Sequence, residues 1–151
     1  MRIKGIFCHD LPIYKDINGT YCSTTLTDDL FRRYFSVVDE LFVATRVYRL
    51  DCTYVEAHQE KISLPNMQFL EFPNMNKPQY AFTLLPKAKK YLEKIIEEMD
   101  VVFIRGGIIG DLGVKAARKL EKPYLIEVAG CAWDSYWYHS IIGKIVAPYM
   151  E

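Results

Sequence analysis

The sequence carries no surplus of either charge, since 19 lysines and arginines balance 19 aspartates and glutamates. This balance argues against a dedicated nucleic-acid-binding protein, which normally has a basic excess. The sequence also has no apolar run that approaches the roughly 18 residues of a membrane-spanning helix. Half of its residues are nonetheless hydrophobic and a quarter are charged. That composition is typical of a globular domain with a proper core and not of a disordered chain.

Residues that bind metals are also scarce. The chain has three histidines, and its four cysteines form no C-x-x-C pair. We therefore expect neither a metal site nor a bound cofactor. Unpaired thiols suit a reducing compartment, which favours a cytoplasmic protein. The four cysteines are Cys8, Cys22, Cys52 and Cys131.

The common catalytic and nucleotide-binding motifs are missing as well. The sequence contains no G-x-S-x-G, no H-E-x-x-H and no pairing of a cysteine nucleophile with histidine. The first expected strand is followed by CHDLP at 8–12 and not by G-x-G-x-x-G, which argues against a dehydrogenase-type nucleotide site. The one glycine-rich stretch has Arg105 where the first glycine of that motif would stand. It is not a P-loop either, because no Lys-Ser/Thr follows it.

What the sequence does have is the stretch VVFIRGGIIGDLG at 101–113. A short apolar run that ends in glycines predicts a buried parallel strand, a turn and a helix. Glycines at the turn allow positive φ and let a ligand approach the backbone, and the start of the helix suits an anion. Arg105, at the carboxyl end of the strand, lies where ligands bind in open α/β sheets. The alternative is that Gly106, Gly107, Gly110 and Gly113 only form a tight turn.

Strand and helix patterns alternate along the whole chain. This alternation predicts one α/β domain over residues 1–151, Rossmann-like, with three α/β/α layers and a mainly parallel sheet. We also expect a helix capped by Thr27, and a hairpin with a type I′ turn at Asn18-Gly19. One face of that helix carries Leu26, Leu30, Tyr34 and Val37. We expect strands over 3–8, 40–47, 67–72, 100–105 and 123–128, further helices over 81–99, 109–120 and 135–151, and a loop over 48–65.

Three polar segments are expected to meet at the carboxyl edge of such a sheet, namely 9–21, 105–111 and 127–139. Glu127 interrupts an apolar strand, and Arg105 on the neighbouring strand is its natural partner. Both a structural ion pair and a catalytic role remain open for these two residues. His139 is either a general base or a surface histidine. The candidates to line the site are Asp10, Tyr14, Lys15, Tyr21, Arg105, Gly106, Gly107, Asp111, Glu127, Asp134 and His139; for the first four, a solvated loop residue is the alternative.

Three segments resemble the amino-terminal domain of bacterial family-four glycosyltransferases, in particular those of capsular and surface polysaccharide assembly. They are IKGIFCHDLPIYKDINGTYCSTTLTDDLFRRY at 3–34, VVFIRGGIIGDLG at 101–113 and PYLIEVAGCAWDSYWYHSIIGKIVAPY at 123–149. The resemblance implies a GT-B enzyme with two facing Rossmann-like domains. The first would bind the acceptor and the second the nucleotide-sugar donor, with retaining transfer and no divalent metal. By the same analogy the loops at 11–21 and after Arg105 line the acceptor side, and Gly130 and Asp134 approach the transferred sugar.

The chain departs from that family in two ways. Many members have His-Gly after the fifth strand, where this chain reads Ala129-Gly130; Asp134 or His139 is the candidate to replace that catalytic histidine. The carboxy-terminal donor domain is also absent, so we expect a truncated acceptor-side domain that has no transferase activity alone.

The resemblance also implies partners. These are a nucleotide-sugar, bound through the absent domain, and a saccharide or lipid-linked saccharide acceptor, with peripheral contact at the inner face of the membrane left open. A homodimer or a separate carboxy-terminal partner is also open. The alternative function is a non-catalytic binding module or one subunit of a split glycosyltransferase.

Overall fold

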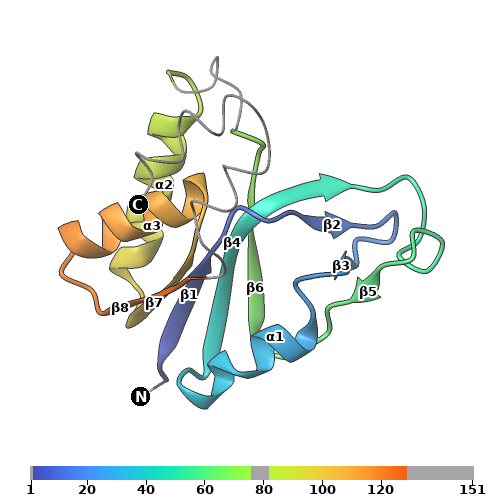
Figure 1. Ribbon diagram of the computed structural model, residues 1–151, viewed down its shortest axis with the longest axis horizontal. Helices are drawn as coiled ribbons and strands as arrows, with labels where there is room; N and C mark the ends of the chain where they lie inside the picture. The colour runs from blue at the N-terminus through green and yellow to red at the C-terminus, as the bar shows by residue number, and fades with distance from the viewer. Residues whose placement is uncertain (1, 76–81, 129–151) are drawn as a thin grey trace.

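The computed structural model describes residues 2–75 and 82–128. Its centre is a sheet of five parallel strands: β1 (Lys4–Cys8), β4 (Glu40–Arg49), β6 (Met67–Phe72), β7 (Val101–Arg105) and β8 (Tyr124–Glu127). The strands lie in the order β6-β4-β1-β7-β8 (Figure 1). The chain thus winds outward from β1 to β6 and then returns to β7 on the other side of β1. This confirms the predicted α/β fold with a mainly parallel sheet, and it puts the topological switch point between β1 and β7.

Helices cover both faces of this sheet. α2 (Leu85–Glu97) and α3 (Ile108–Lys119) bury one apolar cluster, which includes Leu92, Ile96 and Ile109. On the opposite face lie the short helix α1 (Asp28–Arg32) and the 3₁₀ turn η1 (Tyr34–Ser36), over a second cluster that includes Phe7 and Phe31. β1 contributes Ile6 to the first cluster and Phe7 to the second, because successive side chains of a strand point to opposite faces. This is why the sequence of a central strand with helices on both faces is a continuous run of apolar residues.

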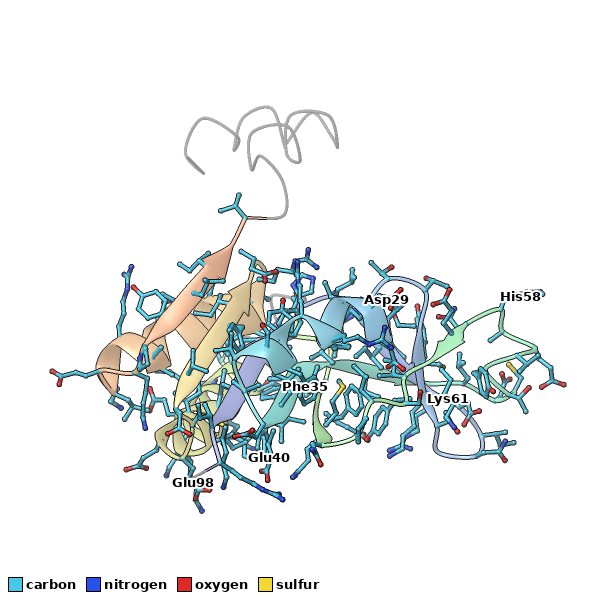
Figure 2. All side chains as sticks on the ribbon, turned by 90° about the horizontal axis from the view of Figure 1, so that it is seen from below. Asp29, Phe35, Glu40, His58, Lys61 and Glu98 are labelled. Atoms are coloured by element: carbon cyan, nitrogen blue, oxygen red, sulfur yellow. The ribbon has the colours of Figure 1, made fainter. Side chains whose placement is uncertain are left out.

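A second, smaller sheet extends from the end of β4. β2 (Ile13–Lys15) runs parallel to Val47–Arg49 of β4, and β3 (Tyr21–Ser23) pairs antiparallel with both β2 and β5 (Glu60–Lys61). β4 is ten residues long because its first part belongs to the parallel sheet and its last part to this extension. Figure 2 shows His58 and Lys61 at the far end of the extension, remote from Glu98 at the end of α2.

The predicted hairpin is confirmed, but its type I′ turn is wrong. That turn needs positive φ at two successive residues, whereas Gly19 has a φ of 81° and Asn18 is not in the positive-φ region. The turn is closed instead by Asp16, whose carbonyl accepts from Gly19 N (2.9 Å) and whose carboxylate Oδ1 accepts from Asn18 N (2.9 Å) and Thr20 N (2.8 Å). An Asx-type side-chain turn has therefore replaced the expected backbone turn.

Two further expectations need correction. The helix after Thr27 is shorter than its apolar spacing predicts, because the chain tightens into η1 at Tyr34. This change of winding turns Val37 outward, where it is 53% exposed, and buries Val38 in its place. The stretch expected as a loop over 48–65 begins with the end of β4 and contains β5.

In residues 2–75 and 82–128, no helix has the length and apolar character needed to cross a bilayer. The helix predicted over 135–151 lies outside the described residues.

Candidate functional site

The candidate site lies at the switch point, where the carboxyl ends of β1, β7 and β8 are side by side. Cys8 at the end of β1 pairs with Ile104 of β7, and Arg105 at the end of β7 pairs with Glu127 at the end of β8. Residues that follow β1 therefore face the turn that follows β7. The structure brings together Asp10, Arg105, Gly106, Gly107 and Glu127, as the sequence predicts for this edge of the sheet.

The turn after β7 is shaped by two glycines with different roles. Gly107 has a φ of 93°, and a Cβ at this position would lie 2.3 Å from the Cβ of Asp10, so no side chain fits here. A Cβ on Gly106 would meet no atom of residues 2–75 and 82–128 within 4 Å. Gly107 is therefore required by the fold, whereas Gly106 borders open space at the edge of the sheet.

The other two glycines of the stretch serve helix packing. A Cβ on Gly110 would lie 2.4 Å from the carbonyl oxygen of Arg105, and one on Gly113 would lie 3.0 Å from the Cβ and Sγ of Cys8. α3 consequently lies directly on the ends of β1 and β7. Close packing explains these two positions without any ligand.

Arg105 and Glu127 form the expected ion pair, with Nε and Oε2 3.4 Å apart. Two residues at the junction of α1 and η1 complete the cluster: Arg33 Nη2 donates to Oε2 (2.7 Å) and the Tyr34 hydroxyl donates to Oε1 (2.8 Å). Burial, followed by the hydrogen bond to Glu127, raises the pKa of Tyr34 to about 12. Tyr34 thus stays a neutral donor, and Glu127 ties the end of β8 to η1.

Only part of the hydrogen-bonding capacity of the Arg105 guanidinium is taken up by this cluster. Its Nε is buried and finds no hydrogen-bond acceptor among the described residues, although it lies within ion-pair distance of Glu127. A guanidinium carries five N–H donors in a planar fork. Because the Nε is buried, the donors that Arg105 can offer to a ligand at the carboxyl edge are those of its two Nη groups.

His9, which the sequence analysis did not select, packs against the same turn. Its Nδ1 lies 3.2 Å from the carbonyl oxygen of Arg105 and 3.1 Å from that of Gly106. Two carbonyl oxygens can only accept, which assigns the proton to Nδ1. Burial lowers the pKa of His9, the two carbonyl hydrogen bonds raise it, and the charge of Arg105 adds to the lowering. The sequence could have indicated His9 through its position alone, because it directly follows the first strand.

Asp10 is held by Arg46 of β4, a second residue that the sequence analysis did not select. Arg46 Nε donates to the carbonyl oxygen of Asp10 (2.6 Å) and lies 3.2 Å from its carboxylate Oδ1. Arg46 interrupts the apolar pattern of its strand, as Glu127 does in β8, and that interruption was the signal in the sequence.

The hairpin candidates lie apart from this cluster. Lys15 Nζ and the Tyr21 hydroxyl both donate to Oε1 of Glu71 on β6, at 2.9 and 2.7 Å, and the ring of Tyr21 stacks on Phe69. Tyr14 packs its ring against Tyr48, with centroids 6.1 Å apart. A role for Tyr14, Lys15 and Tyr21 in ligand binding stays a prediction.

The remaining candidates lie outside the Arg105–Glu127 cluster or outside the described residues. Asp111 is exposed in the first turn of α3, where its charge suits the helix dipole. Gly130, Asp134 and His139 lie outside the described residues. Within the part of the chain that the structure describes, no group of three or more histidine, cysteine, aspartate or glutamate side chains could hold a metal ion. The site thus offers the donors of Arg105 and an imidazole acceptor, which suit a polar, hydroxylated ligand.

Comparison with known proteins gives one informative match. No protein-family model matches the chain. The carboxy-terminal domain of the PF1911 hydrogenase from Pyrococcus furiosus superposes with a TM-score of 0.46 and 10% identity, over 83% of this chain and 92% of that one; these values support no functional argument. Protein CapJ of Staphylococcus aureus is 32% identical over 153 residues, which cover 97% of this chain and 37% of CapJ. This chain is thus similar, over almost its whole length, to a part of CapJ that is less than half of that protein.

Proposed function

We propose that this chain is the acceptor-binding, amino-terminal part of a GT-B glycosyltransferase that acts in the assembly of capsular or surface polysaccharide. The similarity to Protein CapJ carries the proposal, because it extends over 97% of the chain and we take the name of that relative to refer to the capsule. It agrees with the family resemblance of the segments at 3–34, 101–113 and 123–149.

The geometry of the switch point supports binding of a saccharide. Ligands of open α/β sheets bind outside the carboxyl ends of the strands, at the point where the strand order reverses. There the chain offers the Nη groups of Arg105, the imidazole of His9 and, among the described residues, open space beside Gly106. A saccharide hydroxyl can donate to the imidazole and accept from the guanidinium, so this mixed set fits an uncharged acceptor sugar.

The chemistry proposed for the whole enzyme is retaining transfer without a divalent metal, from a nucleotide-sugar that a second domain binds. The residues of this chain would bind and orient the acceptor, and Asp134 or His139 would replace the histidine of the family's His-Gly motif. The chain alone is then expected to transfer no sugar.

Calorimetric titration of the pure chain with UDP- and GDP-sugars tests this assignment. We expect no binding, because the donor site belongs to the other domain. Micromolar binding would mean that this domain holds the nucleotide, and turnover of a nucleotide-sugar by the chain alone would contradict the assignment outright. In the source organism, deletion of the gene is expected to reduce surface polysaccharide, and an unchanged polysaccharide would count against the biological role.

A further inference from the structure

We propose that Nε2 of His9 is a fixed hydrogen-bond acceptor for one hydroxyl group of the acceptor saccharide. The inference rests on the proposed function for the class of ligand, but its geometric basis is independent of the comparisons. It assigns a positioning role to a residue that neither the sequence motifs nor the family resemblance selected.

The first step of the argument is the fixed tautomer. Nδ1 faces the carbonyl oxygens of Arg105 and Gly106 at 3.2 and 3.1 Å, so it must donate and must carry a proton. A neutral imidazole with its proton on Nδ1 has a lone pair on Nε2. The turn after β7 thus holds the ring in one orientation and in one acceptor form.

The second step is that Nε2 is available. No hydrogen bond to Nε2 is formed by the described residues, and this atom is not among the buried polar atoms that lack a partner. The ring is half-buried and packs edge-on against Phe7, with centroids 5.9 Å apart. Among the residues that the structure describes, none fills the space beside the neighbouring Gly106. A ligand above this turn can therefore reach Nε2.

The third step is the charge state of the ring. Burial, the largest effect, holds the pKa of His9 below its ordinary value. The hydrogen bonds to the carbonyl oxygens of Gly106 and Arg105 partly oppose this lowering, and the charge of Arg105 adds to it more than the charge of Asp10 opposes it. His9 is therefore neutral near pH 7. Protonation would convert Nε2 from an acceptor into a donor. Acid is therefore expected to weaken ligand binding, while the hydrogen bonds from Nδ1 to the two carbonyl oxygens remain.

The experiment uses two matched variants of the 151-residue chain. His9→Asn retains an amide nitrogen near the place of Nδ1, so it can still donate to the two carbonyl oxygens, but it has no atom in place of Nε2. His9→Gln extends a polar amide toward the place of Nε2. The probes are the methyl glycosides of glucose, galactose and N-acetylglucosamine at millimolar concentration. The readouts are amide shifts of Gly106 and Gly107 and the nitrogen shifts of the His9 ring.

We expect the wild type to show a Nδ1-protonated ring whose Nε2 signal moves when a glycoside binds. His9→Asn is expected to stay folded and to bind about three- to tenfold more weakly, the loss of one neutral hydrogen bond. His9→Gln is expected to recover part of this loss. Binding by the wild type should also weaken in acid, as the pH falls through the lowered pKa of His9, and this dependence should disappear in His9→Asn.

The outcomes separate the two proposals. If the wild type binds a glycoside and His9→Asn binds it equally well, the role of His9 is wrong and the proposed function is unaffected. If the ring carries its proton on Nε2, the role of His9 is wrong whatever binds. If no glycoside moves Gly106, Gly107 or the His9 ring, both the acceptor-domain assignment and the role of His9 are contradicted.

Discussion

Two glutamates at opposite edges of the parallel sheet each hold a cluster of one tyrosine and two basic side chains. Each lies near the carboxyl end of an edge strand, Glu71 on β6 and Glu127 on β8. Each accepts a tyrosine hydroxyl on Oε1 and an arginine on Oε2, and each has a second cation nearby. The partners of Glu71 are Lys15, Tyr21 and Arg49, and those of Glu127 are Arg33, Tyr34 and Arg105.

The difference lies in how completely the donors are used. Both cations of the Glu71 cluster donate hydrogen bonds to the carboxylate, Lys15 at 2.9 Å and Arg49 at 3.3 Å. In the Glu127 cluster, Arg105 comes within 3.4 Å without forming a hydrogen bond. The first cluster is a closed tie between the hairpin and β6. The second leaves Arg105 without a hydrogen bond to the carboxylate, beside the turn after β7. Similar groups thus form a closed structural tie at one edge, and at the other edge they form the cluster that we propose binds ligand.

Substitution of a glycine in the turn after β7 is expected to have the largest effect on the free energy of unfolding. Gly107→Ala would force a side chain into the positive-φ region and onto Asp10, so we expect a loss of about 2–4 kcal/mol in the free energy of unfolding. Gly106→Ala is the matched control, because its Cβ would enter open space; its unfolding free energy should change by less than about 0.5 kcal/mol. Urea unfolding measures both. Equal losses in the two variants would refute the distinction between a required glycine and an open one.

The closed cluster can be tested at its centre. Glu71→Gln removes the charge that binds Lys15, Tyr21 and Arg49, and we expect a loss of about 1 kcal/mol in unfolding free energy, because the side chain is a third exposed and solvent screens the pair. Glycoside binding at Gly106 should be unchanged, since Glu71 lies at the other edge of the sheet. A change of binding without a change of stability would reverse the roles given to the two clusters.

The arginine that lies farther from the carboxylate in each cluster can be compared with its counterpart, at 3.3 Å for Arg49 and 3.4 Å for Arg105. Arg49→Met and Arg105→Met should each cost less than about 1 kcal/mol in stability, because the tyrosine and the other cation still satisfy the glutamate. The glycoside-induced shifts of Gly106 should be lost in Arg105→Met and retained in Arg49→Met. Loss of the shifts in both variants, or in neither, would show that the spare donors of Arg105 do not bind ligand.

The smallest expected effect is on the pH dependence of stability. Hydrogen bonds from Lys15 and then Tyr21 hold the pKa of Glu71 below its ordinary value of 4.5. The unfolded chain then binds the proton more readily, so this contribution is complete above pH 4.5 and is lost as the pH falls through the lower folded pKa. The urea midpoint of Glu71→Gln should therefore fall less steeply over this acidic range than that of the wild type. Parallel slopes would show that Glu71 is not held by its partners.

The parallel sheet was predictable because most of its strands contain a short run of apolar residues, and the helix patterns between them indicate parallel crossovers. The Arg105–Glu127 pair was predictable for a similar reason, since a charge in an apolar strand needs a partner. Arg33 and Tyr34 were not, because they are 94 and 93 positions away from Glu127 and only tertiary packing brings them there. His9 was missed because the carbonyl oxygens that orient its ring belong to the main chain of a distant turn. Every residue type has such a carbonyl, so the sequence does not indicate this contact.

The length of β4 has a consequence for how the candidate site can admit a ligand. One strand is shared by the parallel sheet and the extension, and the hairpin is further tied to β6 through Glu71. The hairpin cannot swing away without breaking β2 from β4, which would require opening a paired strand and not a loop movement. The hairpin, which the sequence predicts to line the acceptor side, is therefore held in a fixed position. We expect selectivity on that side to depend on the shape of the ligand and not on closure around it.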